Sequence, residues 1–178
     1  MNIESVELKN EVVTIGDTAE KIERHDDWQT PDSIFDPLNA IFQFNVDAAA
    51  SPDNTKCGEF FTEEMDALNH DWCFRFGRRT VVWCNPPYKD LAPWVQKAHD
   101  EACRGATVVM LIPNSRGRGW YKGIIIPAKQ KGYCRTYSYG PGRISFVDPH
   151  PGAKRSNPKQ DNLLVVFTPP MPEKWSLD

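Results

Sequence analysis

The sequence predicts an α/β fold built on a mainly parallel sheet, with an antiparallel element near its C-terminal end. Three observations lead to this prediction. Apolar runs of strand length alternate with amphipathic segments of helical period along the chain. The run from Ala106 to Ile112 is almost continuously apolar, which is typical of a strand whose sheet is covered on both faces. Gly140-Pro141 is a turn signal between two short strand patterns, and it favours an antiparallel pairing there.

Three helices are expected from the spacing of apolar residues. The first covers residues 31–42, because a proline and an acid open it and apolar residues then recur at helical spacing. The second covers residues 91–103 and is closed by Gly105. The third covers residues 119–126 and is ended by Pro127.

The strands complete a single domain over residues 28–170. An acidic and weakly patterned arm, residues 1–27, precedes this domain and is interpreted as flexible, and a tail, residues 171–178, follows it. Strands are expected at residues 44–47, 59–62, 80–84, 106–112, 133–139, 142–147 and 163–167.

The composition excludes several classes of protein. The chain has 178 residues, is 40% hydrophobic and 25% charged, and is therefore of ordinary globular type. No apolar run approaches the ~20 residues of a membrane-spanning helix, and the N-terminus lacks the order of a secretory signal. The five cysteines include no C-x-x-C pair, which argues against a disulfide framework and a cysteine-based zinc site. We therefore expect a cytoplasmic protein without a metal.

The small net charge of −3 conceals an uneven distribution. Residues 1–103 carry 9 Lys and Arg against 20 Asp and Glu, whereas residues 104–160 carry 11 against 1. A basic segment in a protein without overall positive charge is expected where lysines and arginines meet phosphate groups. Solvated loop charges are the alternative interpretation.

The segment Asn85-Pro86-Pro87-Tyr88 carries the most chemical information. It follows a predicted strand, and ligands of open α/β sheets bind beyond the carboxyl ends of strands. The two prolines fix φ and remove two N–H donors, so the carbonyls of Asn85 and Pro86 hold a defined direction. A planar amino group such as adenine N6 could donate to the Asn85 side-chain oxygen and to the Pro86 carbonyl, which frees its lone pair to attack an electrophilic methyl group. Tyr88 could stack on the ring. The alternative is a strand-ending turn without a catalytic role.

With this motif and others, the sequence resembles the short bacteriophage family of DNA N6-adenine methyltransferases. The resemblance implies a Rossmann-like fold, S-adenosylmethionine as the cofactor with S-adenosylhomocysteine as its product, double-stranded DNA as the partner, and action in the cytoplasm of a bacterial host, without a metal or a membrane. The matching segments, in order over about residues 28–168, are Trp28-Gln29-Thr30-Pro31, Asp47-Ala48-Ala49-Ala50-Ser51, Phe60-Phe61-Thr62, Asp66-Ala67-Leu68, Asp71-Trp72, Trp83 to Tyr88, Trp94-Val95, Lys97-Ala98, Leu111-Ile112-Pro113 and Gly142-Arg143-Ile144-Ser145-Phe146.

The resemblance implies three groups of cofactor-binding residues. Residues 29–31 match the segment that lines the methionine end of the cofactor, residues 47–51 match the first cofactor motif, and Asp66 matches the acid that accepts from the cofactor's adenine amino group. An acid for the ribose hydroxyls is also implied, and the sequence does not separate Glu63 from Glu64. A capping role for Asp47 and an exposed turn for Asp66 are the alternatives. The candidates are Gln29, Thr30, Pro31, Asp47, Ala48, Ala49, Ser51, Glu63 and Asp66.

Two departures from the family's usual pattern affect these expectations. Residues 48–58 are too few to hold both a glycine-rich loop and a long helix, so the cofactor loop is expected to be atypical. The chain after Pro113 is too short for a separate recognition domain, so the loops at residues 114–119 and 148–160 are expected to contact DNA. The candidate DNA contacts are Arg116, Arg118, Arg143, Lys154 and Arg155, with a structural ion pair as the alternative for Arg143. Four aromatic residues could stack on an extruded base, although core packing is their default interpretation: Trp120, Tyr121, Tyr137 and Tyr139.

Three functions remain open at this point. The favoured one is methyl transfer from S-adenosylmethionine to N6 of adenine in DNA. The second keeps the cofactor and changes the acceptor to RNA or to a protein glutamine, because any planar amino nitrogen suits the motif. The third is a non-catalytic DNA-binding protein of the same fold, which the charge distribution fits equally well.

Overall fold

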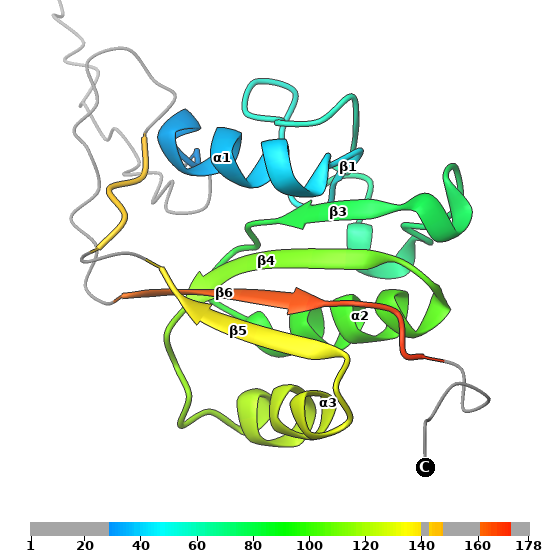
Figure 1. The fold of residues 1–178 in the computed structure, drawn as a ribbon. Helices are drawn as coiled ribbons and strands as arrows, with labels where there is room; N and C mark the ends of the chain where they lie inside the picture. Colours follow the sequence, from blue (N-terminus) through cyan, green and yellow to red (C-terminus); the bar gives the residue numbers. More distant parts are fainter. Residues whose placement is uncertain (1–28, 140–142, 148–160, 172–178) are drawn as a thin grey trace, which may run out of the picture.

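The computed structural model describes residues 29–139, 143–147 and 161–171 as an α/β domain with helices on both faces of one sheet (Figure 1). The expected acidic arm, the 148–160 loop and most of the tail lie outside the described residues. The α-helices are α1 (Asp32–Phe42), α2 (Leu91–Arg104) and α3 (Ile126–Gln130); η1 (Ala67–Asn69) and η2 (Gly77–Arg79) are single 3-10 turns, and η3 (Tyr121–Ile125) is π-helical. The strands are β1 (Val46–Asp47), β2 (Glu59–Phe60), β3 (Val81–Cys84), β4 (Thr107–Pro113), β5 (Cys134–Ser138) and β6 (Asn162–Phe167).

The sheet has the order β2-β1-β3-β4-β6-β5. The strands β2, β1, β3 and β4 are parallel, whereas β6 runs antiparallel to both of its neighbours. The chain leaves β1 to form β2 on one side and returns to form β3 on the other. Such a reversal of strand order is where ligands bind in open α/β sheets, outside the carboxyl ends of the strands. The predicted fold class, a mainly parallel sheet with an antiparallel element near its C-terminal end, is confirmed.

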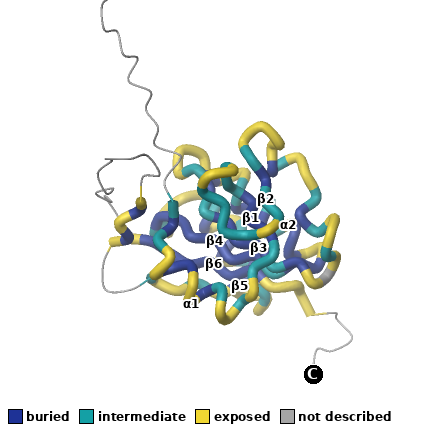
Figure 2. Tube along the Cα trace, turned by 90° about the horizontal axis from the view of Figure 1, so that it is seen from above, coloured by how far each residue is buried: buried dark blue, intermediate teal, exposed yellow. Residues whose placement is uncertain are grey.

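The two faces of the sheet bury separate apolar clusters, and the central strands β1, β3, β4 and β6 form the most deeply buried part of the described chain (Figure 2). On one face, Phe35 of α1 packs edge-on against Trp83 of β3, with 5.5 Å between the ring centroids. On the other face, α2 buries Val95 and Ala98 against β3, β4 and β6. This double cover explains why β4 and β6 are apolar along nearly their whole length.

Two predicted elements are wrong in detail. The third helix is predicted to end at Pro127, but helical structure continues through that residue to Gln130. Pro127 directly follows the π-helical segment η3 and the backbone is helical on both sides of it, so the altered hydrogen-bond pattern of η3, rather than a helix start, accommodates the missing N–H. The strand expected at residues 142–147 is also absent from the described part of that segment, which makes only an isolated antiparallel bridge from Val147 to Gln29. None of the helices that the structure describes is long and apolar enough to cross a membrane.

Candidate active site

The site is built at the carboxyl edge of the sheet, where the predicted catalytic and cofactor segments meet. Asp47 at the end of β1 is in register with Trp83 of β3, and the next backbone N–H, that of Ala48, donates to the Trp83 carbonyl at 2.9 Å. Asn85 follows β3 directly. The first cofactor motif and the Asn85–Tyr88 segment therefore leave the sheet side by side on neighbouring parallel strands.

The Asn85–Tyr88 segment is held by one hydrogen bond within the segment and by a second one from β6. The Tyr88 hydroxyl donates to Asn85 Oδ1 at 3.2 Å and accepts from Asn162 Nδ2 at 3.0 Å. Burial raises the pKa of Tyr88, and the hydrogen bond from Asn162 offsets part of that rise, so the hydroxyl keeps its proton and can donate it. Pro86 is buried, and none of the described residues donates a hydrogen bond to its carbonyl. Two acceptors are thus present at this tip: one lone pair of Asn85 Oδ1 and the Pro86 oxygen.

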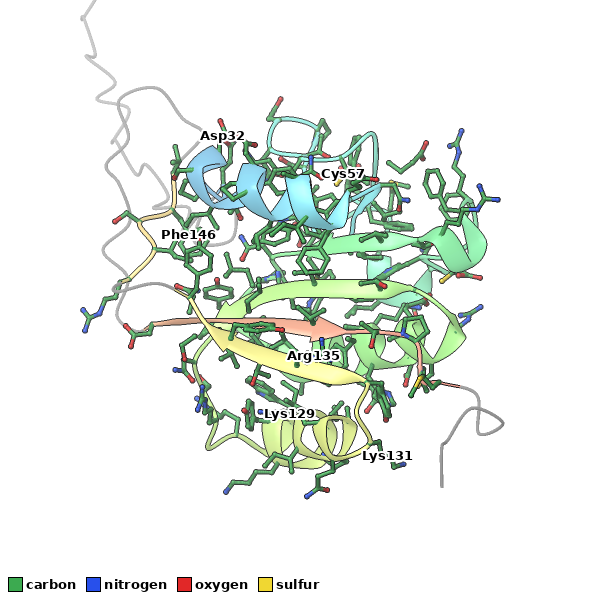
Figure 3. All side chains as sticks on the ribbon, viewed as in Figure 1. Asp32, Cys57, Lys129, Lys131, Arg135 and Phe146 are labelled. Atoms are coloured by element: carbon green, nitrogen blue, oxygen red, sulfur yellow. The ribbon has the colours of Figure 1, made fainter. Side chains whose placement is uncertain are left out.

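The Tyr88 ring contacts Phe146 edge-on, with 6.0 Å between the centroids. Phe146 belongs to the apolar cluster on the α1 side of the sheet and lies beside the tip of β5 (Figure 3). Tyr88 still has an exposed fraction of 37%, so ring surface remains for a base to stack on. Its stacking role stays a prediction.

Asp47 shapes the loop that follows β1. Its carboxylate accepts from the backbone N–H of Ala49 at 3.3 Å and of Lys56 at 3.0 Å. Burial raises the pKa of Asp47 to about 6, although these two donors and the Lys56 charge act in the opposite direction. Among the described residues 48–58 there are turns and no helix, which confirms that the loop is atypical. The alternative role of Asp47 as a helix cap is wrong, because no helix follows it in residues 48–58; its carboxylate accepts from loop N–H groups instead.

The segment at residues 29–31 lies against this loop. Gln29 Nε2 donates to the Asp53 carbonyl at 3.1 Å, and Asp32 forms an ion pair with Lys56. Thr30 is buried with an exposed fraction of 4%. Two of the segments predicted to bind the cofactor, which are far apart in the sequence, are therefore brought together.

The acids predicted to bind the cofactor follow β2 at the edge of the sheet. Asp66 is exposed, has a left-handed φ of 50°, and accepts from Asn69 Nδ2 at 2.6 Å with one carboxylate oxygen, which leaves the other able to accept from a ligand. Glu63 and Glu64 are both exposed, and the structure does not separate them. The backbone N–H of Ser51 donates to Asn54 Oδ1, which tightens the turn after the first cofactor motif. Carboxylate acceptors beside a loop of small residues fit a cofactor that carries an amino group, hydroxyls and a positive charge.

A family comparison decides the class of protein. A family model described as DNA N-6-adenine-methyltransferase (Dam) matches residues 17–177. The chain belongs to this family. It is therefore a DNA adenine methyltransferase, and enzymes of this class take their methyl group from S-adenosylmethionine. The resemblance seen in the sequence is confirmed.

Two phage proteins are similar to this chain. The DNA N-6-adenine-methyltransferase of Haemophilus phage HP1 (strain HP1c1) is 30% identical over 148 residues, which are 82% of this chain and 80% of that protein. The DNA N-6-adenine-methyltransferase of Escherichia phage T1 is 31% identical over 95 residues, which are 53% of this chain and 38% of that protein.

The predicted DNA contacts of this Dam-family chain are placed only in part. Arg116 and Arg118 are exposed in the loop after β4, at the carboxyl edge, and Arg116 Nη2 donates to Ser138 Oγ at 3.3 Å. Arg143 is exposed in the segment that carries Phe146, whereas Lys154 and Arg155 lie outside the described residues. Of the four aromatic candidates, Tyr121 is buried, Trp120 and Tyr139 pack against the core, and Tyr137 is 50% exposed.

Sequence reasoning missed three residues of the site: Lys56, Phe146 and Asn162. Lys56 gave no signal of its own, and Phe146 was noted only as part of the matching segment at residues 142–146, because the partners of both residues come from distant segments. Asn162 did give one, since it is the single polar residue of a strand that otherwise reads Leu-Leu-Val-Val-Phe.

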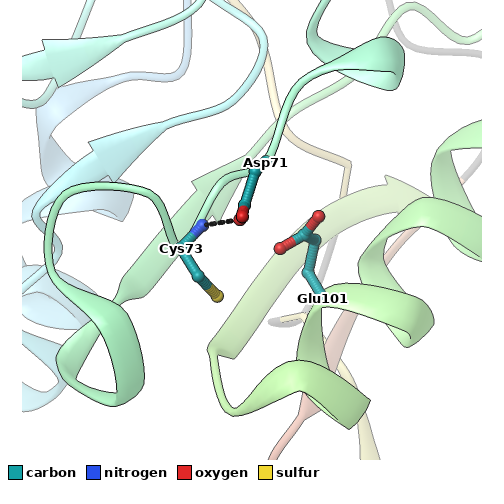
Figure 4. Close-up of side chains that lie close together, drawn as sticks. All are labelled: Asp71, Cys73 and Glu101. Carbon is teal, nitrogen blue, oxygen red and sulfur yellow. Dashed lines mark hydrogen bonds between the residues drawn. The ribbon is translucent and has the colours of Figure 1, made fainter.

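A second polar cluster lies at the opposite edge of the sheet, between the start of the 71–76 loop and the end of α2 (Figure 4). Ligand atoms of Asp71, Cys73 and Glu101 lie within 4.8 Å of one another. Two cations already neutralise the carboxylates: Lys97 Nζ lies 2.7 Å from Glu101, and Arg104 lies 2.8 Å from Asp71. Burial and the neighbouring Glu101 raise the pKa of Cys73 to about 11. A protonated thiol beside compensated carboxylates is typical of a structural ion-pair cluster rather than a metal centre.

Proposed function

We propose that this chain methylates N6 of adenine in DNA at the carboxyl edge of its sheet, with Asn85 and the Pro86 carbonyl as the groups that hold the amino nitrogen. The observation that carries the proposal is the adjacency of β1 and β3. The loop shaped by Asp47 and the tip that presents Asn85 Oδ1 leave neighbouring strands at the point where the strand order reverses.

The cofactor is assigned to the segments around the loop after β1. Residues 29–31 and 47–51 would hold the methionine end, Asp66 would accept from the adenine amino group, and Glu63 or Glu64 would accept from the ribose hydroxyls. S-adenosylmethionine supplies an electrophilic methyl group on a sulfonium centre. The small side chains of Ala49, Ala50 and Ser51, which are only partly buried, support close approach of a ligand to the backbone there.

The target base has to leave the duplex before it can reach this tip, at a cost of a few kcal/mol. Asn85 Oδ1 then accepts one amino hydrogen and the Pro86 oxygen accepts the other. These two hydrogen bonds draw the nitrogen lone pair away from the ring and fix the direction of its attack. Alignment of the nitrogen with the methyl group, together with acceptors set in place beforehand, accounts for most of the expected rate enhancement.

DNA is assigned to the basic loops around the same edge. Arg116, Arg118 and Arg143 lie among the described residues and Lys154 and Arg155 belong to the 148–160 loop, and all are proposed to meet phosphates or base edges of double-stranded DNA. The positive excess of residues 104–160 supports a polyanionic partner over a protein glutamine.

The experiment that tests this proposal is an acceptor competition with methyl-labelled S-adenosylmethionine. Duplex DNA, RNA and a protein mixture are offered together, and the labelled product is digested and separated. We expect label on N6 of adenine in the DNA fraction. Label in the RNA or protein fraction would show that RNA or protein, rather than DNA, is the acceptor. Absence of both cofactor binding and transfer to any of the three would favour a non-catalytic DNA-binding protein.

A further inference from the structure

Asn162 occupies an unusual place for a polar residue. It is the first residue of β6, it has an exposed fraction of 2%, and it lies opposite Pro113 at the carboxyl edge. Its backbone carbonyl accepts from the Tyr139 N–H at 3.1 Å, and the preceding carbonyl of Asp161 accepts from the Asn114 N–H at 2.8 Å. The position of Asn162 is therefore fixed from both sides by the backbone, independently of its side chain.

The side chain of Asn162 is not explained by stability. Its Oδ1 atom is buried and has no hydrogen-bond partner among the residues that the structure describes. A buried acceptor without a partner costs free energy, and an apolar side chain of the same size would avoid that cost. The five residues that follow in β6 are all apolar and buried. What the amide does provide is its Nδ2 hydrogen bond to the Tyr88 hydroxyl.

That hydrogen bond determines which way the Tyr88 proton points. An amide nitrogen only donates, so the Tyr88 oxygen has to accept from Asn162, and the Tyr88 proton is directed to Asn85 Oδ1. Because the Tyr88 hydroxyl donates, the Asn85 amide is held with its oxygen, rather than its NH₂ group, facing Tyr88. One lone pair of Asn85 Oδ1 is then occupied by Tyr88, and the second is left for the amino group of the target base.

We propose that Asn162 is a positioning residue of the methyl-transfer reaction, which acts through the Tyr88 hydroxyl to hold Asn85 with its oxygen toward the target amine. The three side chains form one chain of hydrogen bonds from β6 to the tip of β3. Asn162 itself touches neither the base nor the cofactor. The inference rests on the proposed role of Asn85 and extends it to a residue 77 positions later in the sequence.

The test is a double-mutant cycle of Asn162→Leu and Tyr88→Phe. Each single variant is expected to lower kcat about tenfold, the equivalent of one missing hydrogen bond, with the Kd for S-adenosylmethionine within twofold of the wild-type value. Because both residues act through the same hydroxyl, the double variant is expected to match the Tyr88→Phe variant rather than fall a further tenfold. A further tenfold loss, or an Asn162→Leu variant with wild-type kcat, would overturn the proposal.

Two more variants separate positioning from folding. Asn45 makes two amide hydrogen bonds at the opposite edge of the sheet, to the Val81 N–H and the Arg79 carbonyl, so Asn45→Leu is expected to lower stability and leave kcat unchanged.

If Asn162→Leu does not fold, Asn162→Asp replaces it. The introduced carboxylate accepts the Tyr88 proton and takes it from Asn85, so kcat is again expected to fall about tenfold, and unchanged kcat would contradict the proposal. If the wild-type enzyme transfers no methyl group to adenine, the proposed function fails, and the positioning role of Asn162 fails with it.

Discussion

The Asp47 carboxylate accepts the backbone N–H of Lys56, nine residues later, at 3.0 Å, and so closes the loop between β1 and β2 on the end of β1. This contact replaces the helix that a longer segment would place between two such strands. It also buries a carboxylate whose pKa is raised to about 6. The loop is therefore held by a group whose charge depends on pH.

Stability is expected to fall as this group ionises. Since the folded chain retains the Asp47 proton to a higher pH than the unfolded chain, rising pH between about 4 and about 6 removes stabilisation. Relative to Asp47→Asn, the wild-type free energy of unfolding should drop by roughly 2 kcal/mol between pH 4 and pH 7. Urea unfolding of the wild type and of Asp47→Asn at several pH values across this range measures the two free energies of unfolding. A difference between the two that stays constant with pH would show that Asp47 is not buried as described.

Asp66→Asn should weaken cofactor binding without unfolding the protein. Asparagine tolerates the left-handed φ of this position, and the residue is exposed, so stability should change by less than about 0.5 kcal/mol. Loss of a charged acceptor for the cofactor amino group should raise the Kd for S-adenosylmethionine about tenfold. Calorimetry measures this, with Asp36→Asn, an exposed acid on α1, as the matched control. Equal affinity of the two variants would remove Asp66 from the site.

Arg116→Ala and Arg118→Ala should weaken DNA binding, because each substitution removes a positive charge that neutralises a phosphate group. KM for DNA should rise, whereas kcat at saturating DNA should stay unchanged. The slope of log affinity against log salt should become less steep by about 0.9 for each phosphate that is no longer neutralised. Filter binding and initial rates at several salt concentrations measure these quantities. Lys131→Ala is the control of equal charge, because Lys131 is exposed beyond α3, away from the carboxyl edge (Figure 3). An equal effect of Lys131→Ala would mean that the positive charge acts without a defined position on the DNA.

Glu101→Ala should be strongly destabilising while sparing catalysis. Glu101 is fully buried, and its removal leaves Lys97 without its counter-charge while Arg104 keeps its ion pair with Asp71, at a cost of about 3 kcal/mol. The double variant Lys97→Met, Glu101→Leu should recover most of the lost free energy of unfolding. Urea unfolding gives the free energies, and turnover per folded molecule should match the wild type because this cluster lies at the far edge of the sheet. A loss below about 1 kcal/mol would indicate that water reaches the cluster.

The local parts of the fold and of the site could be predicted from the sequence. The apolar run that forms β4 predicted a strand covered on both faces, and the prolines after β3 predicted a rigid tip, because both signals are contained within a few neighbouring residues. The position of Asn85 at the carboxyl edge of the sheet followed from its place directly after a predicted strand. These features needed no knowledge of distant contacts.

What the sequence did not provide depends on contacts between distant segments. Pro127 is a helix breaker in isolation, yet the helical backbone continues through it, because it directly follows the π-helical segment η3, whose altered hydrogen-bond pattern accommodates the missing N–H. The segment before Val147 has a strand pattern, but in the described residues it pairs through a single bridge to Gln29. The hydrogen bond of Asn162 to Tyr88 joins residues 74 positions apart, and only the antiparallel insertion of β6 between β4 and β5 creates it.

The central claim is that Asn85 holds the amino group of an adenine in DNA while the methyl group is transferred. Sequencing of modified bases in DNA from cells that express either the wild type or Asn85→Ala tests this claim most directly, with cofactor binding of both proteins measured in parallel. The account predicts N6-methyladenine at a defined site with the wild type and at least a hundredfold less with Asn85→Ala, at a cofactor Kd within about twofold. Methylation at the wild-type level by the Asn85→Ala variant would contradict it.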